Sequence, residues 1–190
     1  MYEHPHEFRI VCIDPGTDTL GVGVLGLNLY SYETTVHEAL TLRASNRIDP
    51  YSTDAQFAGL RYARLQAHSQ SVYEILCRVN PHAVISEAPF LGRFAQSFEA
   101  LVECMSMLRR TVAAWNPAIP LETVDPPSAK KAVGAVITGP DKKESVRLAV
   151  LRTPLIRGPG VYLESLDEHA TDALAVGLYK VKQIKDFYRV

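Results

Sequence analysis

Residues 9–25, RIVCIDPGTDTLGVGVL, decide how the rest of the chain is interpreted. Residues 8–14 are almost continuously apolar, which is typical of a strand whose two faces are both covered. The strand ends in a single acid, Asp14, and the Pro15-Gly16 pair directly after it predicts a turn. A lone carboxylate at the tip of a buried strand needs a chemical reason.

A second strand is predicted over residues 19–26, where apolar residues alternate with Gly21 and Gly23. Since successive side chains of a strand point to opposite faces, the two glycines share one face. Another segment can therefore approach the backbone closely on that face. A third strand over 33–42 would complete an antiparallel meander.

Helices and strands alternate in the remainder of the chain. The first helix, 54–79, is preceded by Thr53, which stands at capping-box spacing from Gln56. Its predicted apolar stripe is Phe57, Leu60, Val72, Leu76 and Val79. The later elements are strands over 82–87 and 120–124 and helices over 95–115, 141–152 and 168–185. This order predicts one α/β domain, residues 8–185, with a mixed central sheet of five strands, three antiparallel and then parallel ones, flanked by helices.

The composition fits a single globular domain of 190 residues with a net charge of −1. The polar start, MYEHPHEF, lacks the basic-then-apolar order of a signal peptide, so we expect a flexible tail over 1–7 and a cytoplasmic protein. Three cysteines, Cys12, Cys77 and Cys104, stand far apart in apolar contexts. They predict buried free thiols rather than a disulfide or a zinc site.

Basic residues are concentrated in segment 126–157, which holds seven Lys or Arg against only Asp141 and Glu144. The seven are Lys130, Lys131, Lys142, Lys143, Arg147, Arg152 and Arg157. Such a concentration can form a local nucleic-acid footprint on an otherwise neutral protein.

Asp14 and Glu87 occupy equivalent places, because each is the last residue of a strongly apolar strand. If the two strands are parallel neighbours, the carboxylates lie side by side at one edge of the sheet, where α/β proteins form their sites. Two unpaired acids there would repel each other, and a divalent cation would relieve that repulsion.

His169 and Asp172 are three residues apart in the last predicted helix and share one face of it. The small residues that follow let this helix pack closely on the sheet, next to the strand-end acids. Three carboxylates and one imidazole suit Mg²⁺ or Mn²⁺, and two such ions about 4 Å apart can clamp a phosphodiester. Spacing alone leaves other roles open, since Asp14 and Glu87 also fit turn or cap acids, Asp172 a solvated helix residue and His169 a helix cap.

Four motifs, in this order, make the sequence resemble the RuvC-like Holliday junction resolvases. They are IDPGTDTLGVGVL at 13–25, SEAPF at 86–90, AKKAV at 129–133 with DKKESV at 141–146, and HATDALAVGL at 169–178. The resemblance covers most of the chain, from about residue 8 to 180. It implies an RNase H-like nuclease domain that works as a homodimer. It also implies an endonuclease that resolves four-way DNA junctions with Mg²⁺ or Mn²⁺ by paired, symmetric nicks.

The resemblance implies catalytic roles for the residues that match these motifs. Asp14, Glu87 and Asp172 match the family's acids, and His169 falls where members carry either Asp or His. These four would be the metal ligands, holding two ions in each active site. Lys143 matches a lysine close to the scissile phosphate.

The same resemblance implies DNA contacts. Phe90 falls where the family keeps an aromatic residue that contacts bases near the junction centre, although a core position is equally compatible with the sequence. Stacking on an unpaired base would contribute about 1–3 kcal/mol. Lys130 and Lys143 match the lysines near the scissile phosphate, and Lys131 and Lys142 are their neighbours on the DNA backbone. Without the resemblance, each lysine would be taken as a solvated helix end.

A two-fold dimer matches the symmetry of a junction with two equivalent strands to cut. The predicted helix over 95–115 is the candidate dimer face, because its apolar residues, Met105 and Met107 among them, spread widely around it. A branch-migration helicase is a further candidate partner in DNA recombination and repair.

The chain departs from the family in its N-terminal tail, in a longer segment before the first helix and in the stretch 156–166. A phage-encoded or divergent member, acting in a bacterial cell or in the host cytoplasm, fits these departures.

Two other functions stay open. The DPGT turn and the glycine-bearing strand after it also resemble the first phosphate loop of actin-like and sugar-kinase ATPases, which share this core fold. Such proteins carry a second acid-Gly hairpin, and the 190 residues contain none. The other alternative is a non-catalytic module that binds branched DNA. ATP hydrolysis without DNA would favour the first, and junction binding without metal-dependent nicking would favour the second.

Overall fold

A mixed sheet forms the centre of the molecule. The computed structural model describes residues 6–91, 95–136 and 142–188, with only the backbone described at 142 and 143. The strands are β1 (Glu7–Asp14), β2 (Thr19–Asn28), β3 (Thr34–Arg43), β4 (Ala83–Glu87), β5 (Leu121–Val124) and β6 (Leu155–Arg157). Their order across the sheet is β5-β4-β1-β2-β3-β6. The first three pair antiparallel, and the other three join in parallel, so the predicted mixed α/β sheet is confirmed.

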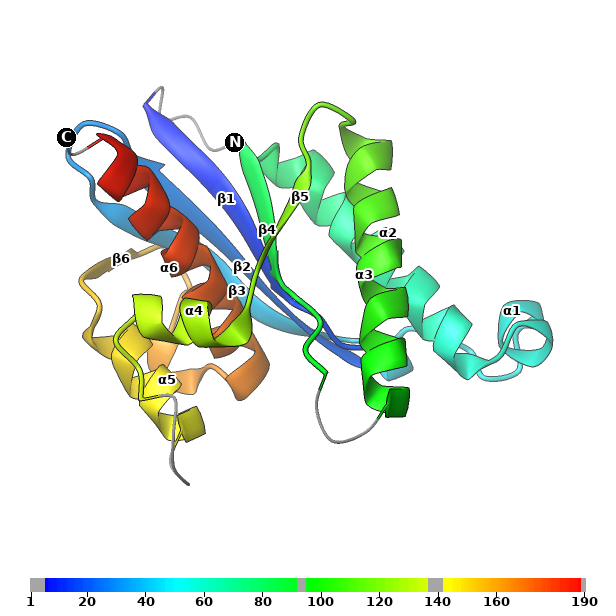
Figure 1. Cartoon of the computed structure of the whole chain (residues 1–190). Coiled ribbons are helices and arrows are strands. Elements are labelled where there is room, and N and C mark those ends of the chain that lie inside the picture. The colour runs from blue at the N-terminus through cyan, green and yellow to red at the C-terminus, as the bar shows by residue number, and fades with distance from the viewer. Residues whose placement is uncertain (1–5, 92–94, 137–141, 189–190) are drawn as a thin grey trace.

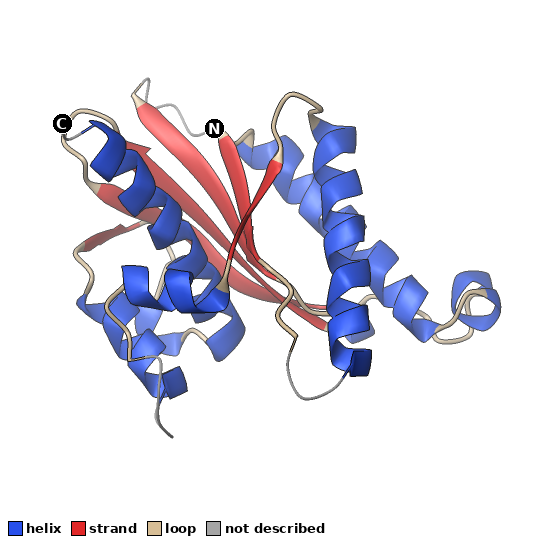
Figure 2. Cartoon of the chain, viewed as in Figure 1, coloured by secondary structure: helices blue, strands red, loops and turns tan. Residues whose placement is uncertain are grey.

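Helices cover both faces of the sheet (Figures 1 and 2). One face carries α2 (Leu60–Val79) and α3 (Ala95–Trp115), with the short α1 (Thr53–Phe57) projecting beyond them. The other face carries α4 (Pro126–Ala132), α5 (Lys142–Arg152) and α6 (Glu168–Tyr188). Short 3₁₀ turns lie at Ala44–Asn46 and Leu163–Ser165. None of the helices in the described ranges is long and apolar enough to cross a bilayer.

Alternate residues of β1 supply the two cores, which explains its continuous apolar run. Ile10 and Cys12 belong to the core beneath α6. Val11 and Ile13 belong to the core beneath α2 and α3. All four side chains are fully buried. Because helices cover both faces of this strand, the stretch 10–13 between Arg9 and Asp14 is apolar and fully buried.

The prediction of five strands is wrong, because a sixth strand, β6, pairs in parallel with the outer edge of β3. Three residues are too few to show the alternation that marks a strand. The predicted tail over 1–7 is also too long. Glu7 pairs with Asn28 in the β1–β2 ladder, and its carboxylate lies 2.7 Å from Nε2 of His37. Residues 1–5 lie outside the described part of the chain.

The predicted helix over 54–79 is interrupted between α1 and α2. Gly59 there has a φ of 89°, a conformation that glycine adopts without strain. Phe57 and Leu60 consequently leave the predicted apolar stripe and are 88% and 45% exposed, whereas the later stripe residues are buried. Ser52, rather than Thr53, caps α1 by accepting a hydrogen bond from a backbone N–H.

Two of the three cysteines are buried as predicted, and the third is not. Burial raises the pKa of the Cys12 thiol and of the Cys104 thiol to about 12. Cys77 is exposed on α2, so its apolar sequence context is misleading. The structure contains no disulfide among these three thiols.

The glycines of β2 receive α6 at very short range. A Cβ atom added at Gly21 would lie 2.0 Å from the backbone oxygen of His169. One added at Gly23 would lie 2.7 Å from Sγ of Cys12 and 2.9 Å from Cδ2 of Leu174. The predicted close approach on the glycine face is therefore confirmed, and the approaching segment is α6.

We expect Gly21→Ala to lower the free energy of unfolding by roughly 3 kcal/mol, the upper end of typical overpacking costs, because a backbone carbonyl cannot rotate out of the way. Gly23→Ala should cost closer to 1 kcal/mol, since it meets only side-chain atoms that can shift. Urea denaturation of both variants and of the wild type measures the difference. Equal costs, or no loss for Gly21→Ala, would contradict the seating of α6 on this glycine.

Candidate active site

Acids gather at the carboxyl ends of three adjacent parallel strands. β1 and β4 are paired up to Ile13 and Ser86, so the next residues, Asp14 and Glu87, end the two strands side by side. Neighbouring strands are about 4.8 Å apart. The two strands are parallel neighbours, which is the condition under which Asp14 and Glu87 were expected to lie side by side. Asp125 follows Val124, the residue that pairs with Glu87, and adds a further acid at this edge.

The first turn of α6 brings His169 to this edge. Nδ1 of His169 lies 2.9 Å from Oδ2 of Asp14, and Nε2 lies 3.1 Å from Oγ1 of Thr19. Asp167 caps the helix by accepting the backbone N–H of Ala170 at 3.0 Å. The hydroxyl of Thr41 on β3 donates to the same carboxylate oxygen at 2.5 Å. The cap therefore ties the start of α6 to the sheet.

The site is short of positive charge. Burial, followed by the charge of Asp14, raises the pKa of Glu87 to about 7, and the charges of Asp172 and Asp125 act in the same direction. Burial also raises the pKa of Asp172, again with a contribution from Asp14. The ammonium group of Lys130 opposes both shifts. These mutual effects mean that Asp14, Glu87 and Asp172 feel one another's charge.

His169 is electrostatically matched to its neighbour. Its hydrogen bond to Asp14 raises the pKa of the imidazole, against the opposing effect of partial burial. The alternative that His169 is the helix cap is wrong, since Asp167 occupies that position, and the ring contacts Asp14. Asp172 is half-buried, so it is not a solvated helix residue.

Divalent cations suit the chemistry of these donors. Three carboxylates and one imidazole make an oxygen-rich set of the kind that Mg²⁺ and Mn²⁺ prefer. Burial first, and then the charge of Asp14, raises the pKa of Glu87 and of Asp172, so a nearby cation would favour their charged forms. Within residues 6–91, 95–136 and 142–188, no three His, Cys, Asp or Glu side chains form a group that could hold a metal ion. Both ring nitrogens of His169 are already hydrogen-bonded, so ligation through this ring requires exchange of one bond.

The predicted DNA-contacting residues differ in exposure and in position relative to the acids. Phe90 is 63% exposed on the loop after β4, so the alternative of a core phenylalanine is wrong. Lys130 is half-buried, and its charge reaches Glu87 and Asp172. Lys131, its neighbour on α4, is exposed and lines a separate hollow beside Tyr179 of α6. The side chains of Lys142 and Lys143 lie outside the described part of the structure.

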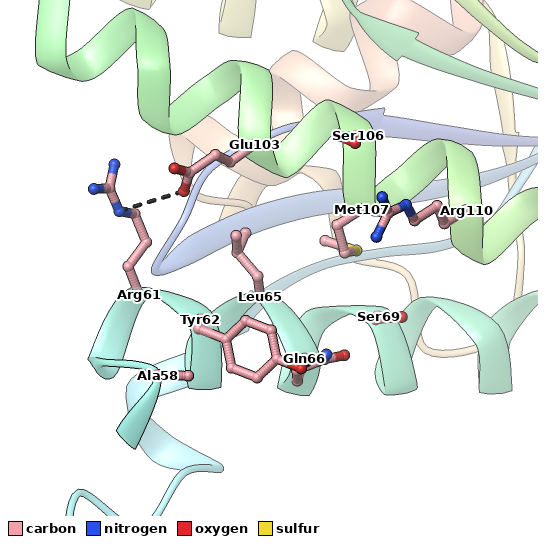
Figure 3. A pocket seen from close by; sticks show the side chains of 10 residues that line it. All are labelled: Ala58, Arg61, Tyr62, Leu65, Gln66, Ser69, Glu103, Ser106, Met107 and Arg110. Atoms are coloured by element: carbon pink, nitrogen blue, oxygen red, sulfur yellow. Dashed lines mark hydrogen bonds and ion pairs between the residues drawn. The ribbon is translucent and has the colours of Figure 1, made fainter. Parts of the chain in front are cut away.

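A groove of about 490 Å³ lies between α2 and α3, away from the acids (Figure 3). An ion pair between Arg61 of α2 and Glu103 of α3, at 3.4 Å, spans it near one end. Arg110 lines its other end. The three predicted catalytic acids and His169 do not line this groove, so it is not the candidate active site. Met107 lines the groove, whereas Met105 is buried in the core and does not belong to an outward face.

Sequence reasoning missed two polar residues at this edge. Asp125 is visible in retrospect as an acid at the end of a strand, and it also accepts a hydrogen bond from Ser128 as the cap of α4. Together with Pro126 at the start of the helix, this is a recognisable signal for the unpredicted α4. Thr19 lies 150 positions from His169, and no local pattern connects the two.

The metal-free protein should lose stability as the pH rises through the range in which Glu87 ionises. Its pKa is about 7 when folded, against an ordinary value of 4.5, so the folded state binds the proton more tightly. The resulting stabilisation is complete below about pH 4.5 and is lost as the pH rises through about 7. Glu87→Gln has no proton to lose. As the pH rises from 5 to 8, the free energy of unfolding of this variant should therefore increase relative to that of the wild type by on the order of 1–3 kcal/mol.

Urea unfolding in the presence of EDTA at pH 5 and pH 8 measures this gain. Glu74→Gln, at an exposed position of α2, is the matched control and should follow the wild type at both pH values. If the free energy of unfolding changes equally for Glu87→Gln and the wild type between pH 5 and pH 8, the Glu87 carboxyl is not desolvated in the folded protein.

No family model matches the sequence, and no curated protein does. Solved structures do match. T. thermophilus RuvC in complex with a Holliday junction substrate has a TM-score of 0.66 and 22% identity, covering 95% of this chain and 96% of that one.

Two further resolvases have a similar structure. The yeast mitochondrial Holliday junction resolvase has a TM-score of 0.65 and 14% identity, covering 96% of this chain and 82% of that one. The fowlpox virus Holliday junction resolvase has a TM-score of 0.54 and 12% identity, covering 93% of this chain and 99% of that one. The matches extend over nearly the whole chain at low identity. The chain therefore has the RNase H-like fold that these resolvases share.

Proposed function

We propose that this chain is a structure-selective DNA endonuclease that resolves Holliday junctions by metal-dependent phosphodiester hydrolysis, with paired symmetric nicks. Three observations at this negatively charged edge carry the proposal: Asp14 and Glu87 end parallel strands side by side, His169 contacts Asp14 at 2.9 Å, and the charge of Asp14 acts on Asp172. The similarity to RuvC in complex with a Holliday junction substrate supports four-way DNA as the substrate.

The four side chains would hold Mg²⁺ or Mn²⁺. Divalent cations, when bound, supply activation of a water molecule and stabilisation of the leaving oxygen. His169 contacts Oδ2 of Asp14 through Nδ1 at 2.9 Å, which would fix the orientation of this carboxylate. Glu87 retains a proton near neutral pH without a cation, and cation binding would release it.

DNA would approach the same edge. Lys130, which is half-buried and whose charge acts on Glu87 and Asp172, would offset the charge of the scissile phosphate. Phe90 is exposed three residues after Glu87 and would stack on an unpaired base at the branch. Lys142 and Lys143 begin α5 and remain proposed contacts to the DNA backbone, with Lys143 closest to the chemistry. Lys131 faces another hollow, so we expect it to contact only more distant phosphates.

A homodimer would supply the second cut of a junction. Val102 on α3 is 44% exposed, and α3 together with the α2–α3 groove remains the candidate dimer face. Sedimentation equilibrium at micromolar concentration tests this arrangement. The chain would work in the cytoplasm of a bacterial cell or of a phage-infected host, with a branch-migration helicase as a candidate partner.

The packing of the hairpin glycines argues against the ATPase alternative. A phosphate loop needs backbone that is open to the nucleotide. A Cβ at Gly16 would lie 2.1 Å from the backbone oxygen of Thr19, and Gly21 and Gly23 are covered by α6 and Cys12. The hairpin is therefore filled by the protein itself.

Asp14→Asn tests the nuclease. Removing an outer-shell partner of a metal site typically costs roughly 10–100-fold in activity. Asp14 is proposed to bind the metal directly, so we expect the variant to lose more than this in nicking of a synthetic four-way junction. Junction binding, measured by electrophoretic mobility shift in EDTA, should persist. Asp186→Asn, at the far end of α6 where Asp186 pairs with Lys182, is the matched control and should nick like the wild type. Undiminished nicking by pure Asp14→Asn protein would refute the assignment of these acids.

Phe90→Ala tests the contact with the branch. Losing one base stack should slow cutting of branched DNA by about 5–100-fold, from about 1–3 kcal/mol per base. Phe187→Ala removes another exposed phenylalanine, near the C-terminus and away from the acids, and should leave the rate unchanged. Single-turnover rates on four-way, forked and linear DNA provide the measurement. Equal rates for both variants would remove Phe90 from the DNA contact.

A further inference from the structure

His169 is held by hydrogen bonds at both ends of its ring. Nδ1 contacts Oδ2 of Asp14 at 2.9 Å, and Nε2 contacts Oγ1 of Thr19 at 3.1 Å. The two partners lie on consecutive strands, at the end of β1 and the start of β2. The imidazole therefore bridges the two strands across the turn that joins them.

The chemistry of the two partners determines where the protons lie. A carboxylate only accepts hydrogen bonds, so Nδ1 must carry a proton toward Asp14. In the neutral ring Nε2 then has a lone pair, and the hydroxyl of Thr19 must donate to it. In the protonated ring Nε2 donates and the same hydroxyl accepts, so the contact is preserved in either state.

Thr19 itself has little freedom to move. It pairs with Arg43 in the β2–β3 ladder, and Gly16 packs against its carbonyl so closely that a Cβ would lie 2.1 Å away. The preceding Asp18 accepts the backbone N–H of Ala44 at 2.8 Å with its carbonyl and that of Ser45 at 3.0 Å with its carboxylate. The hydroxyl of Thr19 is thus presented from a fixed piece of backbone.

We propose that Thr19 is a positioning residue of the candidate active site. Its hydroxyl fixes the His169 ring so that Nδ1 keeps its proton and donates it to Asp14, while the Nε2 lone pair is retained. Gly21 contacts only the backbone of His169, whereas the ring is hydrogen-bonded to Asp14 and Thr19. A carboxylate oxygen of Glu168 also faces Nε2, at 3.9 Å, beyond hydrogen-bond distance. The consequence for nicking rests on the proposed function, whereas the state of the ring does not.

The first measurement is nitrogen-15 NMR of the imidazoles in the metal-free full-length protein at about pH 9, where histidine rings are neutral. The chain has six histidines, and the His169 signals are identified by their loss in His169→Gln. The wild type should show His169 protonated at Nδ1. Thr19→Ser keeps the hydroxyl and should give the same signals. Thr19→Val keeps the shape without the hydroxyl and should show a mixture of the two tautomers.

The second measurement is junction nicking under saturating Mn²⁺. Thr19→Val should lower kcat by about 2–10-fold, the range expected for one net hydrogen bond, with the KM for the junction unchanged. Thr19→Ser should restore the wild-type kcat. A change in KM with unchanged kcat would overturn the positioning role, because it would make Thr19 a DNA contact.

Three NMR results would also overturn the proposal: a wild-type His169 protonated at Nε2, unchanged His169 signals in Thr19→Val, or no rescue by serine. If Thr19→Val does not fold, the tautomer of His169 in the wild type and in Thr19→Ala, which also lacks the hydroxyl, still tests the role of Thr19. A wild-type protein that nicks no junction would refute the proposed function, and the NMR measurements would then decide the role of Thr19 alone.

Discussion

The backbone contact between Gly21 and the first turn of α6 is the constraint on which the rest of the site depends. In the β1–β2 ladder Gly21 is the partner of Asp14, so the helix comes down directly beside the strand-end acid. Any side chain at this position would hold His169 away from Asp14. Asp172, one turn further along α6, reaches the same edge because the helix starts there. A single missing side chain therefore allows two residues of a distant helix to join an acid on the first strand.

Electrostatics give the edge its character. Asp14 follows four fully buried residues that face two apolar cores, so its carboxylate stands at the point where the strand leaves them. Half-buried carboxylates then lie near one another, and Lys130 offsets only part of their repulsion. Such a group of carboxylates is unfavourable for the folded chain alone. It becomes favourable when a cation binds and supplies the opposite charge. The same groups that destabilise the unliganded protein are those best suited to chemistry on a phosphodiester.

Much of this arrangement could be predicted from the sequence, because long apolar runs and their terminal acids are local patterns. The parallel pairing of β1 and β4, the position of α6 and the approach to the glycine face all followed from such patterns. The break at Gly59 could not be predicted, since it depends on one positive φ that a helical pattern of neighbours conceals. β6 is too short for any periodicity and exists because the edge of β3 offers free backbone groups. The Thr19–His169 contact joins residues whose proximity only the folded sheet creates.

The uneven burial of the three thiols has a practical consequence. Cys12 and Cys104 are enclosed and hold their protons tightly, so alkylating reagents have access to Cys77 alone. Cys77 lies near the end of α2, and β4 then runs from Ala83 to Glu87 in the opposite direction. At about 3.3 Å per residue, that strand places the two ends of the sheet roughly 15 Å apart. The natural chain thus has one attachment point for a fluorophore or spin label, at the opposite end of the sheet from the clustered acids.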